Sequence, residues 1–162
     1  MKVDVVVEIP KGSRNKYEFD EETGDIRLDR VLRSAVHYPG DYGEVPNTLG
    51  EDGDPLDAII INRFPVFPGC VVPVRILGVL EMIDSGDNDE KLVGVPEGDP
   101  EFADWKDLND VPLSTRDEIK EFFSSYKNLE RGKEVQVKEW LGVDKAEEIL
   151  KKAQEAYKAK NG

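Results

Sequence analysis

Short stretches of alternating apolar and polar residues run through the first 95 positions, the pattern of strands buried on one face. In residues 3–9 every odd position is apolar, whereas the even positions hold Asp4, Val6 and Glu8, so Glu8 leaves the face opposite the core. Residues 16–19 and 26–30 flank a Gly-containing loop and predict a hairpin. Its inward-facing side chains are expected to be Tyr17, Phe19, Ile26 and Leu28. Further strands are predicted at 58–62, 70–80, 91–95 and 135–140, and residues 31–50 show no regular pattern.

Two later segments have apolar residues at helical spacing. The first follows Ser114 and Thr115, which form overlapping capping boxes with acidic residues three positions on, and it runs to Gly132. Its apolar stripe consists of Ile119, Phe122, Phe123, Tyr126 and Leu129. The second helix is predicted at about 144–160, with Asp144 as its cap. Many short strands and two helices predict an α+β, mainly β, fold built on a barrel.

Three carboxylates crowd the segment before the strand at 58–62. Asp52 and Asp54 share a face of an extended chain, whereas Asp57 would point away if the chain were regular. Gly53 and Pro55 allow a turn between them, because glycine reaches dihedrals closed to other residues and proline constrains the residue before it. The turn would let all three carboxylates converge.

Convergence of unpaired carboxylates is costly. Two of them about 4 Å apart repel by roughly 1 kcal/mol in water and about 4 kcal/mol at an effective dielectric of 20. A divalent cation would remove this repulsion, and oxygen ligands without Cys or His favour Mg²⁺, Mn²⁺ or Ca²⁺ over zinc. An ordinary acidic surface turn is the alternative interpretation of the segment.

A second acidic loop covers residues 84–90, just before Lys91. Alone, it is equally typical of a solvated hairpin tip. Together with the first loop and with the cations Lys16, Arg30 and Lys127, it indicates phosphoryl chemistry. Clustered metal ions stabilise attacking and leaving oxygens, while lysine and arginine hold the non-bridging ones.

Composition narrows the function classes. The 162 residues, 38% of them hydrophobic, have the length of one domain spanning 1–162, with no run long enough to cross a bilayer. A start without a signal-peptide pattern and a lone Cys70 lead us to expect a cytoplasmic protein. The formal charge of -13 argues against nucleic acid and membrane partners. A single histidine, His37, gives little support to a His-based triad or a zinc site and is interpreted as structural or exposed.

The run from Asp52 to Asp57 reads Asp-x-Asp-Pro-x-Asp. It occurs in order with Glu8-Ile9-Pro10, Lys16-Tyr17-Glu18, Asp29-Arg30, Tyr38-Pro39, Asp41-Tyr42-Gly43, Asp84, Asp89, Lys91 and Tyr126-Lys127. Over nearly the whole chain, up to about Trp140, this set closely resembles the soluble family I inorganic pyrophosphatases of the prokaryotic single-domain type.

The resemblance implies a five-stranded OB-like β-barrel with two main helices packed outside. It also implies Mg²⁺-dependent hydrolysis of inorganic pyrophosphate to two orthophosphates, by direct attack of a metal-activated water. Several Mg²⁺ ions would bind per site, with Mn²⁺ or Zn²⁺ as possible substitutes and Ca²⁺ as an inhibitor. A homohexamer is the assembly that the resemblance implies.

The resemblance also implies residue roles. Metal ligands would be Glu8, Asp52, Asp57, Asp84 and Asp89. Asp54 is the first choice for general base and Asp89 the rival, because coupled carboxylates titrate as a set. Phosphate oxygens would be bound by Lys16, Arg30, Tyr42, Tyr126 and Lys127, with Lys91 as a further substrate-binding residue and with Glu18 and Tyr38 in support.

Three residues depart from the family pattern. Ser85 stands where many relatives have Glu, which affects the outer metal sites, and Glu121 and Ser125 stand where bacterial relatives often carry interface histidines. Two rival functions fit the sequence less well. A calcium-binding module is disfavoured because an EF-hand loop beginning at Asp52 would need Gly and Glu where Asp57 and Arg63 stand. An OB-type nucleic-acid binder is opposed by the negative charge.

Overall fold

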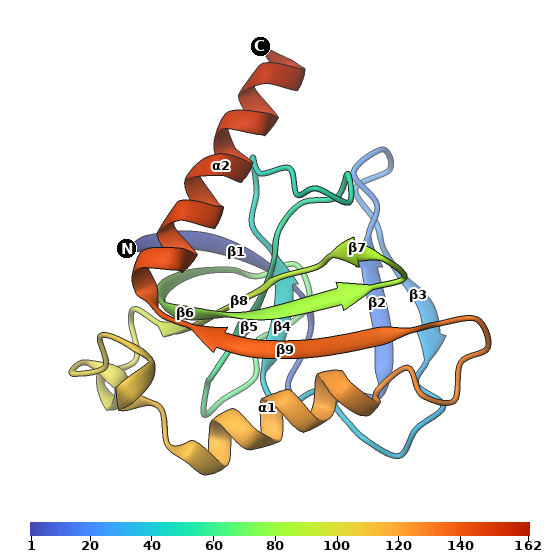
Figure 1. Ribbon diagram of the computed structural model, residues 1–162, viewed down its shortest axis with the longest axis horizontal. Helices are drawn as coiled ribbons and strands as arrows, with labels where there is room; N and C mark the ends of the chain where they lie inside the picture. Colours follow the sequence, from blue (N-terminus) through green and yellow to red (C-terminus); the bar gives the residue numbers. More distant parts are fainter.

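The computed structural model describes residues 1–162 and is built around a closed ring of five strands (Figure 1). In ring order the strands are β1 (Lys2–Ile9), β4 (Asp41–Glu44), β5 (Asp57–Ile60), β8 (Lys91–Pro96) and β6 (Val71–Asp84), and β6 pairs again with β1. Only β5 and β8 run parallel. Two further strands, β7 (Asp87–Asn88) and β9 (Val135–Leu141), pair with the far half of β6. The predicted five-stranded OB-like barrel is confirmed.

A hairpin stands beside the barrel as a separate two-stranded sheet. It consists of β2 (Asn15–Phe19) and β3 (Ile26–Val31), with Lys16 directly opposite Arg30. The hairpin itself was predicted, but the inward placement of Leu28 was wrong, since this side chain is 55% exposed. The reason is that β2 contacts β1 of the barrel, whereas β3 is the outer strand of the pair.

Two helices cover the barrel, and two short 3-10 helices, η1 (Pro100–Phe102) and η2 (Leu108–Asp110), precede the first of them. Helix α1 (Leu113–Ser125) lies under β9 in Figure 1. Helix α2 (Val143–Asn161) ends next to the C-terminus, and its last turns extend away from the barrel. Both predicted caps were wrong, because Pro112 and Gly142 occupy the N-cap positions without a side-chain hydrogen bond. Pro112, with φ of -54°, starts α1 before Ser114 and Thr115 are reached.

Helix α1 also ends earlier than the apolar spacing predicted. Its last residue is Ser125, and Leu129 lies beyond it with 60% of its surface exposed. The hydroxyls of Ser124 and Ser125 donate to the carbonyls of Lys120 and Glu121, one turn back. Such back-bonding competes with the helical hydrogen-bond ladder. The segment after Ser125 forms turns, and this segment carries Tyr126 and Lys127.

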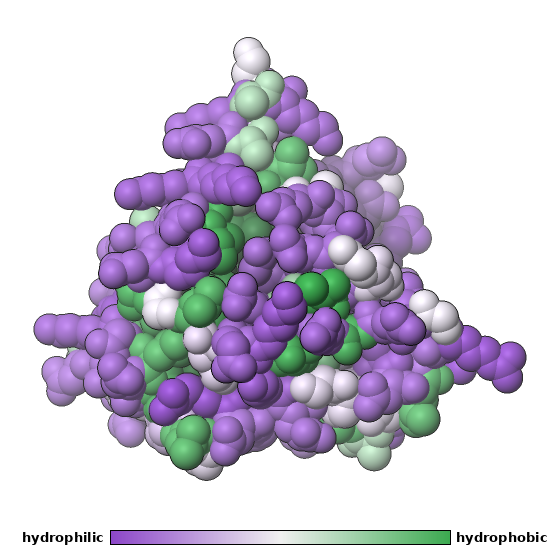
Figure 2. Space-filling model, in the orientation of Figure 1, coloured by the Kyte–Doolittle hydropathy of each residue, from purple (hydrophilic) through white to green (hydrophobic).

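The core has a separate cluster under each helix. Ala146, Leu150 and Ala153 of α2 pack on one part of the barrel. Ile119, Phe122 and Phe123 of α1 pack with two tyrosines, Tyr38 and Tyr42, in another cluster. No helix is both long enough and apolar enough to span a bilayer. Hydrophilic side chains cover most of the face shown in Figure 2.

Strand β4 lies in the region where the sequence predicted no regular structure. Its Gly43 approaches β1 so closely that an added Cβ would meet the carbonyl oxygen of Val6 at 2.0 Å. Only glycine allows this spacing. The close approach holds Tyr42 and Glu44 beside the strand that carries Glu8.

Candidate active site

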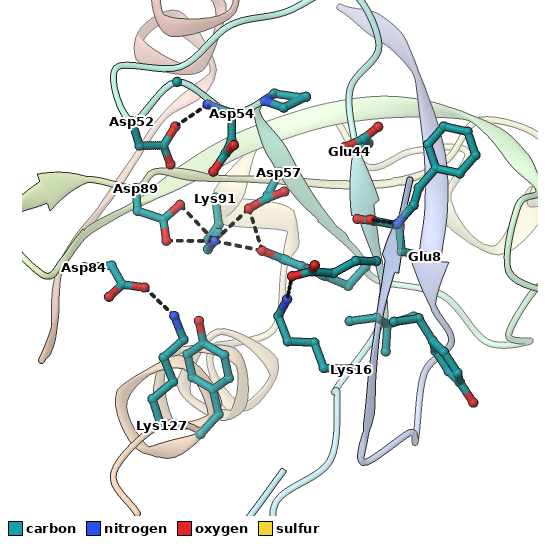
Figure 3. Close-up of a pocket in the computed structure, with 18 of the residues that line it drawn as sticks. Glu8, Lys16, Glu44, Asp52, Asp54, Asp57, Asp84, Asp89, Lys91 and Lys127 are labelled. Carbon is teal, nitrogen blue, oxygen red and sulfur yellow. Dashed lines mark hydrogen bonds and ion pairs between the residues drawn. The ribbon is translucent and has the colours of Figure 1, made fainter. Parts of the chain in front are cut away.

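A cavity of about 600 Å³ opens between the barrel, the hairpin and the end of α1 (Figure 3). Of the twelve predicted site residues, all but Arg30 line it. The predicted residues that line it are Glu8, Lys16, Tyr42, Asp52, Asp54, Asp57, Asp84, Asp89, Lys91, Tyr126 and Lys127. Six separate parts of the chain therefore contribute to one concave surface.

The first acidic loop turns as the sequence predicted. Gly53 has φ of +88°, the backbone N–H of Gly50 donates to the carbonyl of Asp54 at 2.7 Å, and that of Asp54 donates to Oδ1 of Asp52 at 3.0 Å. Asp57 then opens β5. The turn brings all three aspartates onto the same cavity.

Lys91 lies at the centre of the acidic residues in Figure 3 and is 3% exposed. Its Nζ donates to the hydroxyl of Tyr42 at 2.7 Å, to Oδ2 of Asp57 at 2.9 Å and to both oxygens of Asp89 at 2.9 and 3.0 Å. Burial alone would lower the pKa of this ammonium, but the charges of Asp57 and Asp89 raise it well above its usual range. Lys91 therefore stays charged and binds the two acidic loops together.

A second lysine compensates Asp84. Lys127 donates a short hydrogen bond to Oδ2 of Asp84, and the hydroxyl of Ser85 donates to Oδ1 at 3.1 Å. Burial would raise the pKa of Asp84, but the hydrogen bond and charge of Lys127 outweigh it, so the pKa lies below the usual value. Ser85 has φ of +52° and does not line the cavity.

Two glutamates on the opposite side of the cavity have no lysine between them. Glu8 accepts a hydrogen bond from the backbone N–H of Phe19 at 2.8 Å, yet burial, together with the charges of Glu44 and Asp57, raises its pKa to about 8. Burial and the charges of Glu21, Asp57 and Asp54 raise the pKa of Glu44 to about 7. Each of these glutamates is held in a setting that disfavours its charge.

Glu44 is a site residue that the sequence interpretation missed. It ends β4 and stands opposite Asp57 in the register of β4 and β5. The available signal was that Tyr42 and Glu44 lie two positions apart and so share one face of a strand. That signal was lost because residues 31–50 were interpreted as irregular.

Lys16 and Arg30 face each other across the hairpin but differ in position. Nζ of Lys16 contacts Glu18 at 2.6 Å and lies 3.8 Å from Asp29, within the cavity. Arg30 pairs with Asp29 and Glu130 and lines a neighbouring hollow together with Arg33 and Arg131.

The donors of the cavity suit a hard cation. Nine carboxylates and three lysine ammonium groups line it, and no histidine or cysteine does. This donor set fits Mg²⁺, which prefers carboxylate oxygen and water. As arranged, Lys91 and Lys127 lie among the carboxylates, and no three acidic side chains form a closed metal cage. His37 is exposed and outside the cavity, consistent with its interpretation.

Comparison with known proteins places the chain in a family. The family profile described as inorganic pyrophosphatase matches residues 5–158. An inorganic pyrophosphatase from Nostoc sp. is 53% identical over 156 residues, which cover 96% of this chain and 92% of the relative. One from Streptomyces coelicolor is 49% identical over 162 residues, covering 100% and 99%.

Solved structures agree with this placement. The inorganic pyrophosphatase of Helicobacter pylori superposes with a TM-score of 0.94 at 45% identity, over 97% of this chain and 94% of the other. That of Thermus thermophilus gives the same TM-score and identity, over 97% and 91%. The cavity with its acidic loops and lysines, the five-stranded barrel and the similarity over nearly the full chain lead to one conclusion: this protein belongs to the inorganic pyrophosphatase family.

Proposed function

We propose that this member of the inorganic pyrophosphatase family hydrolyses pyrophosphate by direct attack of water on one phosphorus. The P–O bond to the bridging oxygen breaks, and two orthophosphates leave without a covalent enzyme intermediate. The observation that carries the proposal is the cavity itself, where nine carboxylates outnumber three ammonium groups. Such a surface repels a polyanion unless cations bind with it.

The carboxylates proposed to hold Mg²⁺ are Glu8, Asp52, Asp57, Asp84 and Asp89, all of which line the cavity. When bound, Mg²⁺ lowers the pKa of water and offsets the negative charge of the substrate. Mn²⁺ and Zn²⁺ are proposed substitutes. Ca²⁺ is a proposed inhibitor, because it is larger and accepts looser coordination than Mg²⁺.

Asp54 is the proposed general base. Its carboxylate accepts no hydrogen bond from the protein, since its contacts run through the backbone N–H and carbonyl. Asp89, the rival, is engaged through both oxygens by Lys91. An unengaged carboxylate at the cavity wall is free to accept a proton from the attacking water.

The phosphate groups are proposed to bind Lys16, Tyr126 and Lys127, which line the cavity, and Arg30, which lies beside it. Tyr42 and Lys91 were also predicted to bind substrate. The hydroxyl of Tyr42 donates to Asp57 at 2.8 Å while accepting from Lys91. We assign these two residues a supporting part, in which they fix the carboxylates of Asp57 and Asp89.

A homohexamer, a cytoplasmic location and a single domain over residues 1–162 remain predictions. For the hexamer, helix α1 presents Glu121 and Ser125 where the resemblance implies interface histidines. The hydroxyl of Ser125 donates to the carbonyl of Glu121 in its own helix at 2.8 Å. It is therefore already used within the chain.

Phosphate release from pyrophosphate in Mg²⁺, with a nucleoside triphosphate as the comparison substrate, tests the proposal. Asp57→Asn removes a charge that the proposal assigns to metal binding, and we expect kcat to fall by roughly 10²–10⁴-fold. Asp87→Asn is the matched control, because Asp87 is an exposed aspartate of the second acidic loop that does not line the cavity. Undiminished activity of Asp57→Asn, or equal losses in both variants, would refute the mechanism.

A further inference from the structure

Arg30 is held by two carboxylates that differ in their surroundings. Its Nε donates to Oε1 of Glu130 at 2.6 Å, and its Nη1 donates to Asp29. The side chain of Glu130 is 9% exposed, whereas that of Asp29 is 35% exposed. The more buried carboxylate, that of Glu130, thus accepts a hydrogen bond from Nε of the guanidinium, and the more exposed one, that of Asp29, accepts from a terminal nitrogen.

Glu130 links two walls of the active-site cavity. Its backbone N–H donates to the carbonyl of Lys127 at 3.0 Å, within the turn that follows α1. Its carboxylate reaches Arg30 on the hairpin, 100 positions away in the sequence. Since Lys16 stands opposite Arg30 in that hairpin, one ion pair joins the Lys16 wall to the Lys127 wall.

Asp29 is placed differently from Glu130. It contacts Arg30 and also lies 3.8 Å from Nζ of Lys16. The exposed carboxylate of Asp29 therefore faces both Lys16 and Arg30, as an anionic phosphate oxygen would. A guanidinium has five N–H donors in a fixed plane, so a grip on Nε sets the direction of the other four.

We propose that Glu130 is a positioning residue for pyrophosphate binding. Its carboxylate binds Nε of Arg30 and directs the terminal nitrogens to the side of Lys16. When substrate binds, a phosphate oxygen replaces the carboxylate of Asp29 as the hydrogen-bond acceptor of Nη1. The proposal rests on the proposed function of the cavity. Glu130 acts through Arg30 and does not itself contact substrate.

The geometry makes opposite predictions for the two carboxylates. Glu130→Gln weakens the grip on Nε, and we expect the KM for pyrophosphate to rise about tenfold while kcat changes less than about threefold, since charge-assisted hydrogen bonds are the strong ones. Asp29→Asn removes the competitor of the substrate, so its KM is expected to stay equal or fall. Glu134→Gln is the matched control, because Glu134 is exposed and four positions further along the same segment.

A double-mutant cycle separates positioning from a purely structural bridge. In an Arg30→Ala background, Glu130→Gln is expected to leave KM unchanged, because the group that it orients is gone. Glu130→Asp keeps the charge on a shorter side chain and serves if Glu130→Gln does not fold; its KM is expected to rise in the wild-type background only. Thermal unfolding of each variant checks folding.

Three results would overturn the assignment: an unchanged KM in folded Glu130→Gln, an equal rise in KM with and without Arg30, or a rise in Asp29→Asn as large as that in Glu130→Gln. Failure of the proposed function is a separate result, because the wild-type protein would then release no phosphate from pyrophosphate.

Discussion

The carboxylates on the two sides of the cavity differ in what compensates their charge. On one side Asp57, Asp89 and Asp84 contact the ammonium groups of Lys91 and Lys127. On the other side Glu8 and Glu44 form no ion pair, and burial raises their pKa values to about 8 and about 7, although the charge of Lys16 partly opposes the rise at Glu8. Hereafter we call these the lysine-paired side and the glutamate side.

The difference shows how a site can be both preorganised and receptive to metal. On the lysine-paired side, the protein's own cations form ion pairs with the aspartates and hold their carboxylates in place. On the glutamate side, Glu8 and Glu44 would need to lose their protons to hold a cation, because carboxylates coordinate metals in the ionised form. We therefore expect bound Mg²⁺ to change the electrostatics most on the glutamate side.

The largest expected effect is a loss of stability when the lysine-paired side loses the ammonium group of Lys91. Lys91→Met keeps the approximate length of the buried side chain but leaves the half-buried carboxylates of Asp57 and Asp89 without their cation. Breaking a buried ion pair by removing one partner costs about 3–5 kcal/mol, so we expect the free energy of unfolding in chelator to fall by about 3 kcal/mol. Chemical denaturation measures it, and saturating Mg²⁺ is expected to restore much of the loss.

Lys138→Met is the control for that experiment, since it changes an exposed lysine on β9. If Lys91→Met unfolds at the same denaturant concentration as Lys138→Met, the ion pairs of Lys91 contribute nothing to stability. That result would contradict the claim that lysine ion pairs stabilise one side of the cavity.

A smaller effect is expected in the pH dependence of stability. In the metal-free protein Glu8 and Glu44 have pKa values above the ordinary 4.5, so the folded state binds more protons than the unfolded state. Their contribution is fully present below about pH 4.5 and is lost as the pH rises toward about 8. Urea denaturation in chelator is therefore expected to show a falling free energy of unfolding over this range.

Glu44→Gln removes one of the two titrating groups and is expected to flatten that fall. Glu139→Gln, an exposed change on β9, is expected to leave it as steep as in the wild type. Saturating Mg²⁺ is expected to flatten the profile of the wild-type protein as well. If the profile is equally steep in Glu44→Gln and the wild type, the titration of Glu44 does not contribute to the pH dependence of stability.

The smallest effect is expected at Ser85, on the lysine-paired side. Its hydroxyl donates to Asp84, which Lys127 already compensates, so one of two donors is lost in Ser85→Ala. If the lost hydrogen bond weakens Mg²⁺ binding by about 0.5 kcal/mol, the Mg²⁺ concentration at half-maximal activity rises about twofold. A tenfold change in that concentration would mean that Ser85 matters more than its single hydrogen bond suggests.

Much of the fold followed from local sequence patterns. The alternation in β1 and the loop of the hairpin involve only neighbouring residues, and both predictions were confirmed. Strand β4 escaped prediction because four residues beside Gly and Pro give too few positions for alternation to show. What makes it a strand is its pairing with β1 and β5.

Among the predicted site residues too, some features followed from neighbouring residues and others from contacts between distant segments. The spacing of Asp52, Gly53 and Asp54 was enough to predict a turn that gathers carboxylates. Nothing local indicated that Glu130 would meet Arg30 or that Arg30 would lie beside the cavity and not within its lining. Contacts of this kind depend on how distant segments pack.

The sequence by itself determined the chemistry of the site: acidic loops of suitable composition, accompanied by lysines, an arginine and tyrosines in a recognisable order. Only the tertiary structure decided which carboxylates obtained a cation. Lys91 reaches Asp57 from a neighbouring strand, whereas Glu8 and Glu44, on the paired strands β1 and β4, form no ion pair with a lysine or arginine. The physical reason is that charge compensation depends on burial and on distances of a few ångströms, and both are set by strand pairing between parts of the chain that are far apart in sequence.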